Sequence, residues 1–300
     1  MSCFNLLKEQ LNNLCPQLDL RVDEPLERHT SFHIGGPAAL MALPATQDEA
    51  VLCVRTAAKL GIEPFFMGNG SNLLVGDDGI ERFIIKSANL RCCEVQGSIV
   101  TADSGVTLAR LAVFAREQGL TGLEFAHGIP GTLGGAVTMN AGAYGGEMAQ
   151  VVRQVTVITK AGEVEMLYNF DFGYRRSAFY DGSRMILSAQ LELAAGEREQ
   201  IAWRMEELAA RRQSKQPLEY PSAGSMFKRP EGYFAAALID QCGLKGFTVG
   251  GAQVSEKHAG FVVNRGGATC ADVLELVKQV KARVLEQTGV ALEMEVKVLD

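Results

Sequence analysis

Apolar residues recur at helical spacing in several segments of the chain, most clearly after Thr46. The apolar positions of this segment are Val51, Leu52, Val54 and Ala58. The run Thr46-Gln47-Asp48-Glu49 ahead of them has the reciprocal capping pattern, in which a threonine and a glutamate three residues later satisfy each other's backbone amides. Gly61 follows as a stop signal. These features predict a helix over residues 47–60.

The same reasoning predicts five further helices, at residues 4–14, 108–118, 197–215, 234–241 and 272–288. Short apolar or alternating runs predict strands at residues 38–43, 64–67, 83–86, 99–102, 151–160, 164–167 and 292–299. A turn at residues 160–162 makes a hairpin of two of these strands. No internal repeat is evident. A chain of 300 residues with this mixture is predicted to be an α+β enzyme of two or three compact units.

Composition and charge narrow the class of protein. The chain is 47% hydrophobic and 21% charged, which excludes a disordered protein. A net charge of −6 gives no general attraction to nucleic acid or to an anionic membrane. The start lacks a signal-peptide pattern, and no run of eighteen apolar residues occurs. We therefore expect a cytoplasmic protein.

The cysteines and histidines do not predict a metal or a disulfide framework. The seven cysteines are scattered and lack a Cys-x-x-Cys spacing, which is typical of a reducing compartment. The four histidines show no metal-ligand spacing either. We predict no metal.

A first glycine loop, residues 68–74, follows a predicted strand. Gly68 and Gly70 allow positive backbone angles, and consecutive amides in such a turn form a concave site for a diphosphate. The lysine of a P-loop and the strand–Gly-x-Gly-x-x-Gly–helix order of a Rossmann fold are both missing. The loop alone is also compatible with a tight turn between two strands.

A second glycine loop, residues 128–146, contains seven glycines among nineteen residues. Such a density of glycine costs conformational order unless something fills the space that side chains would occupy. A flat, bulky cofactor approached by the backbone is one such filler.

A hydroxyl and two cations cluster in residues 221–230. Ser225 lies between a small-residue turn and the pair Lys228 and Arg229. A serine near fixed positive charge suits proton delivery beside an anionic substrate. An ordinary turn serine is the alternative that this segment alone leaves open.

Six segments, in order along nearly the whole chain, resemble those of the UDP-N-acetylenolpyruvoylglucosamine reductases, flavoenzymes of bacterial peptidoglycan precursor synthesis. The segments are His29-Thr30-Ser31-Phe32-His33-Ile34-Gly35-Gly36, residues 68–74, residues 128–142, Tyr174-Arg175-Arg176-Ser177, residues 221–230 and Glu293-Met294-Glu295-Val296. The short connection from Tyr174 to Ser225 resembles the shorter, second structural type (type II) of this reductase, which lacks an insertion over the substrate.

The resemblance implies an α+β fold in which a two-lobed FAD-binding domain of the vanillyl-alcohol-oxidase type precedes a smaller α+β substrate-binding domain. We expect the first lobe at residues 1–85, the second at 86–205 and the substrate-binding domain at 206–300. The resemblance also implies noncovalent FAD, NADPH as reductant, and reduction of UDP-N-acetylglucosamine enolpyruvate to UDP-N-acetylmuramate. The expected partners are these small molecules, with no nucleic acid, no membrane insertion and a monomeric chain.

The resemblance assigns three catalytic residues. Arg175 would pair with the enolpyruvyl carboxylate, because a guanidinium grips both oxygens and stays charged; Arg176 is its competitor. Ser225 would protonate the carbanionic centre. Glu295 would polarise the enol or relay the proton, and the alternation of a predicted strand places Glu293 on the same face.

The glycine loops and the resemblance together assign the FAD contacts to Thr30, Gly68, Asn69, Gly70, Ser71, Asn72, Leu73, Ile129, Pro130, Gly131, Gly134, Gly135, Asn140, Ala141 and Gly142. Substrate contacts are assigned to Tyr174, Lys228, Arg229 and His258. The sequence leaves open the preference for NADPH over NADH and the residues that contact the uridine.

Two other functions are compatible with parts of the sequence. An FAD-dependent alcohol or lactone oxidase of the same superfamily would keep the fold and change the chemistry, although neither glycine loop offers an obvious residue for a covalent flavin link. A noncatalytic nucleotide-sugar binding module would explain the glycine loops but not the coexistence of Arg175, Ser225 and Glu295.

Overall fold

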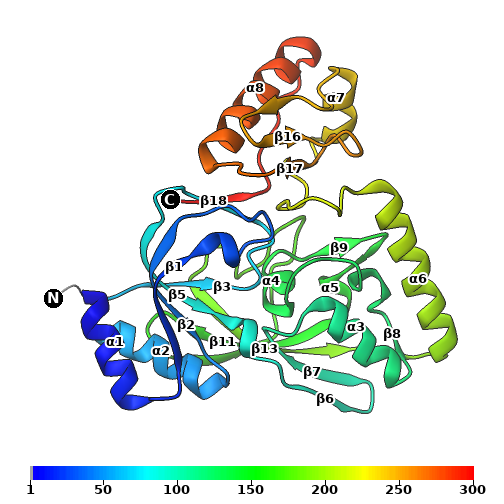
Figure 1. Cartoon of the computed structure of the whole chain (residues 1–300). Helices are drawn as coiled ribbons and strands as arrows, with labels where there is room; N and C mark the ends of the chain where they lie inside the picture. The colour runs from blue at the N-terminus through cyan, green and yellow to red at the C-terminus, as the bar shows by residue number, and fades with distance from the viewer. Residues whose placement is uncertain (1–2) are drawn as a thin grey trace. The chain divides into compact units, whose positions relative to one another are not determined.

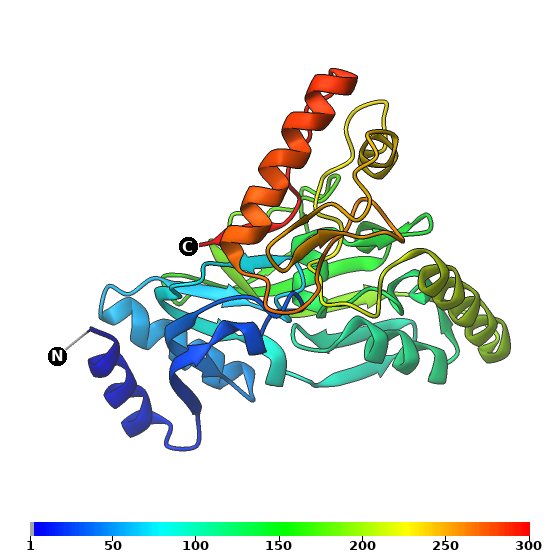
Figure 2. The same cartoon turned by 45° about the horizontal axis from the view of Figure 1, so that its top comes forward.

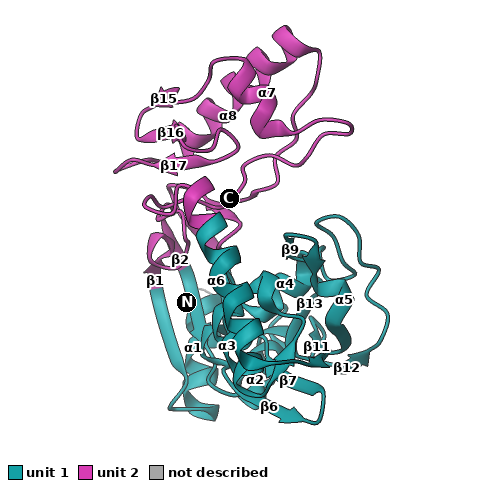
Figure 3. Cartoon of the chain, turned by 90° about the vertical axis from the view of Figure 1, so that its right-hand side faces the viewer, with its two compact units in different colours: residues 1–22, 39–69, 82–211 teal, residues 23–38, 70–81, 212–300 magenta. Residues whose placement is uncertain are grey.

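The structure is a computed structural model that describes residues 3–300. The chain divides into two compact units, coloured separately in Figure 3. Unit 1 contains the amino-terminal stretch up to Val22, Ala39–Asn69 and Arg82–Arg211, and unit 2 contains Asp23–Ala38, Gly70–Glu81 and Arg212–Asp300. The units are discontinuous in sequence, so the first glycine loop begins in unit 1 and ends in unit 2.

The first part of the chain forms a four-stranded sheet with two helices (Figure 1). The strand order is β1-β2-β5-β3, with bounds β1 Asp19–Pro25, β2 Pro37–Leu43, β3 Pro64–Met67 and β5 Ile80–Lys86. The helices are α1 (Cys3–Leu14) and α2 (Gln47–Lys59), and short 3-10 turns lie at Leu26–Arg28 and Ser87–Asn89. Within unit 1, fully buried side chains such as Leu11, Val54 and Phe83 form one core.

The predicted helix after Thr46 is confirmed, and its capping differs in one detail. The Thr46 hydroxyl accepts the Glu49 N–H at 3.2 Å, as predicted. The Glu49 carboxylate accepts the N–H of Ala45 at 2.7 Å, one residue earlier than the reciprocal pattern requires. Both bonds still stabilise the start of the helix, because the N–H groups of Ala45 and Glu49 have no acceptor in the helix backbone.

A five-stranded antiparallel sheet forms the second core of unit 1. Its order is β12-β11-β13-β7-β6, with bounds β6 Cys93–Gln96, β7 Ile99–Asp103, β11 Val152–Thr159, β12 Val164–Leu167 and β13 Arg184–Glu192. The predicted hairpin is confirmed by the pairing of Val157 with Glu165. The helices of this part are α3 (Leu108–Glu117), α4 (Leu133–Thr138), α5 (Met148–Val151) and α6 (Arg198–Lys215).

Smaller elements complete unit 1. They are the pair β8 (Leu120–Thr121) with β14 (Ala194–Ala195), the pair β9 (Gly142–Ala143) with β10 (Gly146–Glu147), and a 3-10 turn at Glu124–Ala126. Helix α3 begins at the Thr107 cap and ends before Gly119, whose φ is +67°. This confirms the predicted stop, because glycine adopts the left-handed conformation without a Cβ penalty.

Unit 2 has its own core around the long helix α8 (Cys270–Thr288). Figure 2 shows α8 beside the small sheet β15-β16-β17, against which it packs. The bounds are β15 Thr248–Val249, β16 Ala252–Val254 and β17 Val262–Asn264, with α7 at Ala235–Gln241. Thr269 and Asp272 form a full capping box at the start of α8, and Gly289 at φ +73° ends it.

The predicted last strand is wrong over residues 292–296. Only β18 (Lys297–Leu299) is a strand, and it pairs in parallel with β4 (Leu73–Val75) of the first glycine loop. Upstream of it, Met294 makes a single antiparallel bridge with Phe227. An isolated bridge does not support the strict alternation from which a shared face for Glu293 and Glu295 was predicted.

Within residues 3–300, no helix is both long and apolar enough to span a membrane. The same residues contain no cluster of histidine, cysteine, aspartate or glutamate that could hold a metal ion.

A substitution at Gly105, which follows β7 of the second sheet, tests how closely the backbone of unit 1 is packed there. A Cβ at Gly105 would lie 1.8 Å from the carbonyl oxygen of Ser87 and 2.6 Å from that of Leu90. We expect Gly105→Ala to lower the free energy of unfolding by about 3 kcal/mol, because two backbone segments must separate. Gly97→Ala, in open space at φ +61°, is the control and should cost only about 1 kcal/mol. Denaturant titration measures both, and equal losses would contradict the expected close approach.

Candidate functional site

In unit 1 the second glycine loop is held against the segment that follows β7. The N–H of Leu133 donates to Val106 O at 2.8 Å, and the N–H of Gly134 donates to Ser104 O at 2.9 Å. A Cβ at Gly134 would lie 2.8 Å from the Cβ of Ser104. Glycine is therefore required at residue 134 for the two backbones to approach. Sequence reasoning treated this stretch as a loop and missed the short helix α4 inside it.

Two hydroxyls at this approach have no hydrogen-bond partner within the described chain. They belong to Ser104 and Thr132, each 1% exposed. Thr132 occupies the cap position of α4, yet its side chain does not cap the helix. Its Oγ1 instead lies 2.6 Å from the position that a Cβ of Gly68 would occupy. The two glycine loops therefore meet here. Neither residue was predicted for the site, although a threonine before a helical run is the signal of a cap.

The Asn140 side chain links the second glycine loop to the turn that carries Arg175. Its Nδ2 donates to Gly173 O at 3.1 Å, and its Oδ1 accepts the N–H of Ala149 at 2.9 Å. Asn140 is buried and has a φ of +42°. The amide therefore makes both of these contacts within the protein, and the predicted contact of Asn140 with the cofactor stays a prediction.

The other predicted FAD contacts of this loop differ in exposure. Gly135 and Pro130 are exposed, and Gly131, Ile129, Ala141 and Gly142 are half-buried. Gly142 is crowded, because a Cβ there would lie 2.8 Å from Gly146 O. The exposed residues Pro130 and Gly135 are accessible to a ligand. The half-buried residues determine the conformation of the loop around them.

Arg175 and Arg176 lie in one turn of unit 1 but in different surroundings. Arg175 has a φ of +54°, is half-buried, and its guanidinium lies 5.5 Å from the centre of the Tyr174 ring. Arg176 is exposed and forms an ion pair with Asp171 at 2.8 Å. A left-handed backbone at a non-glycine residue is strained, and such strain concentrates at functional sites. This contrast favours Arg175 over Arg176 for a binding role.

In unit 2, Ser225 lies on a half-buried segment that continues the pairing of β17. Ser225 is bridged to Phe261, the residue before β17. The N–H of Met226 donates to Gly260 O at 2.8 Å. The serine is therefore fixed by backbone hydrogen bonds instead of lying in a free turn.

The Ser225 segment also pairs with the carboxyl-terminal segment that carries Glu295. The N–H of Glu295 donates to Met226 O at 2.9 Å, and the N–H of Lys228 donates to Glu293 O at 2.8 Å. The Lys228 ammonium also forms an ion pair with the Glu293 carboxylate. The structure thus brings the predicted residues Ser225 and Glu295 onto adjacent segments, while Glu293 is engaged by Lys228.

The end of the first glycine loop, Gly70–Leu73, and the Thr30 segment also lie in unit 2. The N–H of Ser31 donates to Gly70 O, and the Ser31 hydroxyl donates to Ser222 O at 2.7 Å. Thr30 is buried, and its hydroxyl donates to Ile34 O at 3.1 Å. The Thr30 side chain therefore stabilises its own turn, and Ser31 links the loop to the residues before Ser225.

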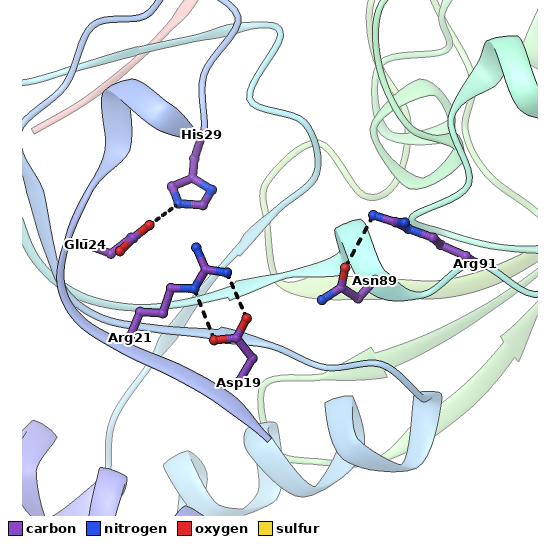
Figure 4. Close-up of polar contacts among 6 residues, drawn as sticks. All are labelled: Asp19, Arg21, Glu24, His29, Asn89 and Arg91. Atoms are coloured by element: carbon purple, nitrogen blue, oxygen red, sulfur yellow. Dashed lines mark hydrogen bonds and ion pairs between the residues drawn. The ribbon is translucent and has the colours of Figure 1, made fainter. Parts of the chain in front are cut away.

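His29 anchors the same segment (Figure 4). Its Nε2 lies 2.8 Å from Glu24 Oε1, and the two side chains are 8% and 14% exposed. A buried pair of this kind is costly to break, since removing one partner leaves a charge or a polar group without compensation. The motif that begins at His29 is thus held in place by its first residue.

The predicted substrate contacts are spread over both units. Tyr174, in unit 1, is 60% exposed. In unit 2 the Arg229 guanidinium lies 4.0 Å from the centre of the Phe234 ring. His258 is half-buried, its Nδ1 accepts the N–H of Gly260 at 3.2 Å, and burial lowers its pKa. His258 is therefore neutral near pH 7, and the hydrogen bond leaves its proton on Nε2.

A separate cleft of about 810 Å³ lies within unit 2. It contains none of the predicted site residues. Its lining comprises Pro25, Glu27, His33, Ile34, Gly35, Gly36, Pro37, Asp77, Tyr220, Pro221, Asn264, Arg265, Gly266, Gly267, Ala268 and Thr269. Asn264 stabilises the wall of this cleft, because its Oδ1 accepts the N–H groups of Gly266 and Ala268. Because the cleft lacks the predicted site residues, we do not assign it as the catalytic site.

The residues of unit 1 fit a bound FAD. Gly68 and Gly134 lie at approaches that exclude a Cβ, so the backbone of both loops is kept bare of side chains there. The hydroxyls of Ser104 and Thr132 are polar groups that the protein alone does not satisfy, and burying such groups is costly. These features fit a protein that binds a large polar cofactor such as FAD, which is the class of the flavin-dependent oxidoreductases.

Comparison with known proteins gives the family. An FAD binding domain matches residues 38–168, and the C-terminal domain of UDP-N-acetylenolpyruvoylglucosamine reductase matches residues 216–299. A UDP-N-acetylenolpyruvoylglucosamine reductase of Caldanaerobacter subterraneus subsp. tengcongensis is 45% identical over 98% of both chains, and one of Clostridioides difficile is 46% identical over 96% of both. The chain belongs to the UDP-N-acetylenolpyruvoylglucosamine reductase family.

A solved structure supports the same assignment. The reductase of Thermus caldophilus is 36% identical, has a TM-score of 0.80, and aligns over 95% of this chain and 99% of its own. The predicted α+β fold, with an FAD-binding domain and a substrate-binding domain, is confirmed.

Thr132→Val tests whether the unsatisfied hydroxyl serves the cofactor. The substitution keeps the shape and removes the hydroxyl, so we expect the cofactor-free chain to gain about 1 kcal/mol in free energy of unfolding. The affinity for FAD should fall about tenfold, because the hydroxyl is satisfied in the loaded protein. Denaturant titration of the cofactor-free protein and flavin fluorescence titration measure the two quantities.

Thr138→Val in the same helix is the matched control. The Thr138 hydroxyl already donates to Gly134 O at 2.8 Å. Its loss should destabilise the cofactor-free chain by about 1 kcal/mol and leave FAD affinity unchanged. If both variants shift stability and affinity in the same direction, the Thr132 hydroxyl does not serve the cofactor.

Proposed function

We propose that the chain reduces UDP-N-acetylglucosamine enolpyruvate to UDP-N-acetylmuramate for peptidoglycan synthesis, with Arg175, Ser225 and Glu295 as its catalytic residues. The observation that carries the assignment is the backbone hydrogen bond from Glu295 to Met226, which joins the serine and carboxylate segments in a chain of this family. When bound, FAD supplies hydride that originates from NADPH to the methylene carbon of the enolpyruvyl ether.

Arg175 holds the carboxylate of the enolpyruvyl group. Hydride addition at the methylene carbon leaves negative charge on the neighbouring carbon and its carboxylate. A guanidinium stabilises that charge through two parallel hydrogen bonds and stays protonated throughout. The strained turn and the half-buried position of Arg175 support this role, and the ion pair with Asp171 assigns Arg176 to the surface.

Ser225 donates its hydroxyl proton to the carbanionic carbon, and Glu295 supports the transfer. A serine is a weak acid, so the transfer needs polar groups that stabilise the oxygen left behind. The backbone pairing of residues 225–228 supports this role, because it holds the segment that carries Ser225 in place. Glu295 polarises the developing enol or returns the proton to Ser225.

The remaining assignments complete the proposal. Tyr174, Lys228, Arg229 and His258 contact the UDP-sugar, and the exposed backbone of both glycine loops contacts FAD. The protein acts as a monomer, and its seven free thiols suit a reducing compartment such as the cytoplasm. The lobes at residues 1–85 and 86–205, the substrate domain at 206–300 and the shorter type II of the reductase stay predictions.

Ser225→Ala separates the two halves of the reaction. We expect the rate of flavin reduction by NADPH to stay near its original value. The rate at which the enolpyruvyl substrate reoxidises the flavin should fall about 100- to 10,000-fold, because only this step needs the proton. Stopped-flow absorbance near the flavin maximum follows both steps, and an unchanged reoxidation rate would exclude Ser225 as the proton donor.

Arg175→Lys tests the planar contact to the carboxylate. The substitution keeps the charge and loses the fork, so we expect kcat/KM for the enolpyruvyl substrate to fall about 10- to 100-fold. Arg176→Lys is the matched control and should change kcat/KM less than about twofold, because an exposed ion pair contributes little. Steady-state kinetics on both variants measures this, and a larger loss for Arg176→Lys would reverse the assignment.

A further inference from the structure

Asn72 contacts the carboxyl-terminal segment at the residue to which a catalytic role is assigned. Its side-chain Nδ2 donates to the carbonyl oxygen of Glu295 at 3.2 Å. Its backbone carbonyl accepts the N–H of Lys297 at 3.1 Å. Both contacts lie within unit 2, so the first glycine loop and the Glu295 segment form one hydrogen-bonded structure there.

The Asn72 amide adds a hydrogen bond between the two segments beyond the strands themselves. The register of the parallel pair β4 and β18 begins at Leu73 and Lys297. The carbonyl of Glu295 lies two residues before Lys297, and the Asn72 side chain donates to it. Short amide side chains commonly bond to backbone groups in this way where regular pairing stops.

Glu295 is consequently held on both sides of its backbone. Its N–H donates to Met226 O on the Ser225 segment, and its C=O accepts from Asn72 on the glycine loop. The distance between the Ser225 and Glu295 segments is set by the first bond, and the rotation of the Glu295 peptide is set by the second.

We propose that Asn72 is a positioning residue for proton delivery: its amide orients Glu295 relative to Ser225, so the first glycine loop serves the catalytic carboxylate as well as the cofactor. This inference rests on the proposed function. The Asn72 side chain donates to Glu295, and the predicted contact of Asn72 with FAD stays a prediction.

The loop is anchored elsewhere, so loss of the Asn72 amide acts on Glu295 and spares the loop itself. At one end, Gly70 O accepts the N–H of Ser31. At the other end, the Asp77 carboxylate accepts the N–H groups of Cys270 and Ala271 at the start of α8, at 2.7 and 3.1 Å. These anchors and the β4 pairing do not involve the Asn72 side chain.

Asn69 provides a comparison within the same loop. It is an exposed asparagine three residues before Asn72, in the part of the loop that belongs to unit 1. If the Asn72 side chain serves only the cofactor, its substitution should have the same effect as substitution of Asn69. If it serves Glu295, the two effects should differ. The two asparagines therefore separate the two roles with the same chemical change.

The experiment compares Asn72→Ala, Asn72→Asp and Asn69→Ala as FAD-loaded proteins. For both Asn72 variants we expect FAD affinity and flavin reduction by NADPH within about threefold of the original. Reoxidation by the enolpyruvyl substrate should slow about 10- to 100-fold, with kcat reduced and KM little changed, because a small displacement of a catalytic group has this cost. Asn72→Asp keeps the shape and loses the donor, so it tests the bond even if Asn72→Ala folds poorly.

The pattern of results decides between the roles. Asn69→Ala should lower FAD affinity without selective loss of the reoxidation step. If Asn72→Ala lowers FAD affinity and slows both steps as Asn69→Ala does, Asn72 is a cofactor residue and the inference is wrong; unchanged rates in both Asn72 variants also refute it. Ser225→Ala and Glu295→Gln, measured alongside, report on the proposed function separately, because their effects do not depend on Asn72.

Discussion

The arrangement of Ser225 and Glu295 in unit 2 depends on one constraint, which is that buried backbone polar groups need hydrogen-bond partners. Residues 225–228 belong to no regular strand, yet their backbone pairs first with residues 260–261 and then with residues 293–295. Met226 makes both contacts, because its N–H donates to Gly260 O and its carbonyl accepts the N–H of Glu295. Meeting that requirement brings Ser225 and Glu295, which are seventy residues apart in the sequence, onto neighbouring segments.

Close backbone approach plays the corresponding part in unit 1. The two glycine loops have little sequence in common apart from glycine, and what they share physically is contact without side chains. Gly68 lies against the Thr132 hydroxyl, and Gly134 lies against Ser104. Both approaches leave polar oxygens without a partner in the described chain, and burying such groups is costly unless another group bonds to them. The density of glycine and the unsatisfied hydroxyls therefore both fit a bound FAD.

Within residues 3–300, the six helices of seven or more residues and the strands β2, β3, β5, β7, β11 and β12 could be predicted from the sequence, because local signals specify them; β13 and the sheet β15-β16-β17 were not predicted. The helix after Thr46, the stop at Gly119 and the hairpin of β11 and β12 each follow from capping, glycine or alternation within about fifteen residues. Family resemblance supplied the cofactor and the proposed catalytic residues.

The features that sequence reasoning missed depend on partners distant in the chain. The strand predicted at residues 292–299 fails over residues 292–296, whose neighbours are the irregular Ser225 segment and the Asn72 side chain. Neither partner is visible in the local pattern. The hydroxyls of Ser104 and Thr132 were missed for the same reason, since only the fold shows that they lack partners.

The charged residues next to the Ser225 segment have different surroundings. Lys228 forms an ion pair with Glu293, whose side chain is 74% exposed, and Arg229 is stacked on Phe234. An exposed ion pair contributes roughly 0–1 kcal/mol, so in the proposed function an anionic diphosphate would displace the Glu293 carboxylate from Lys228 at little cost. Glu293 and Glu295 therefore differ in their contacts, because the Glu293 side chain is engaged by Lys228, whereas the Glu295 backbone is bonded to the Ser225 segment.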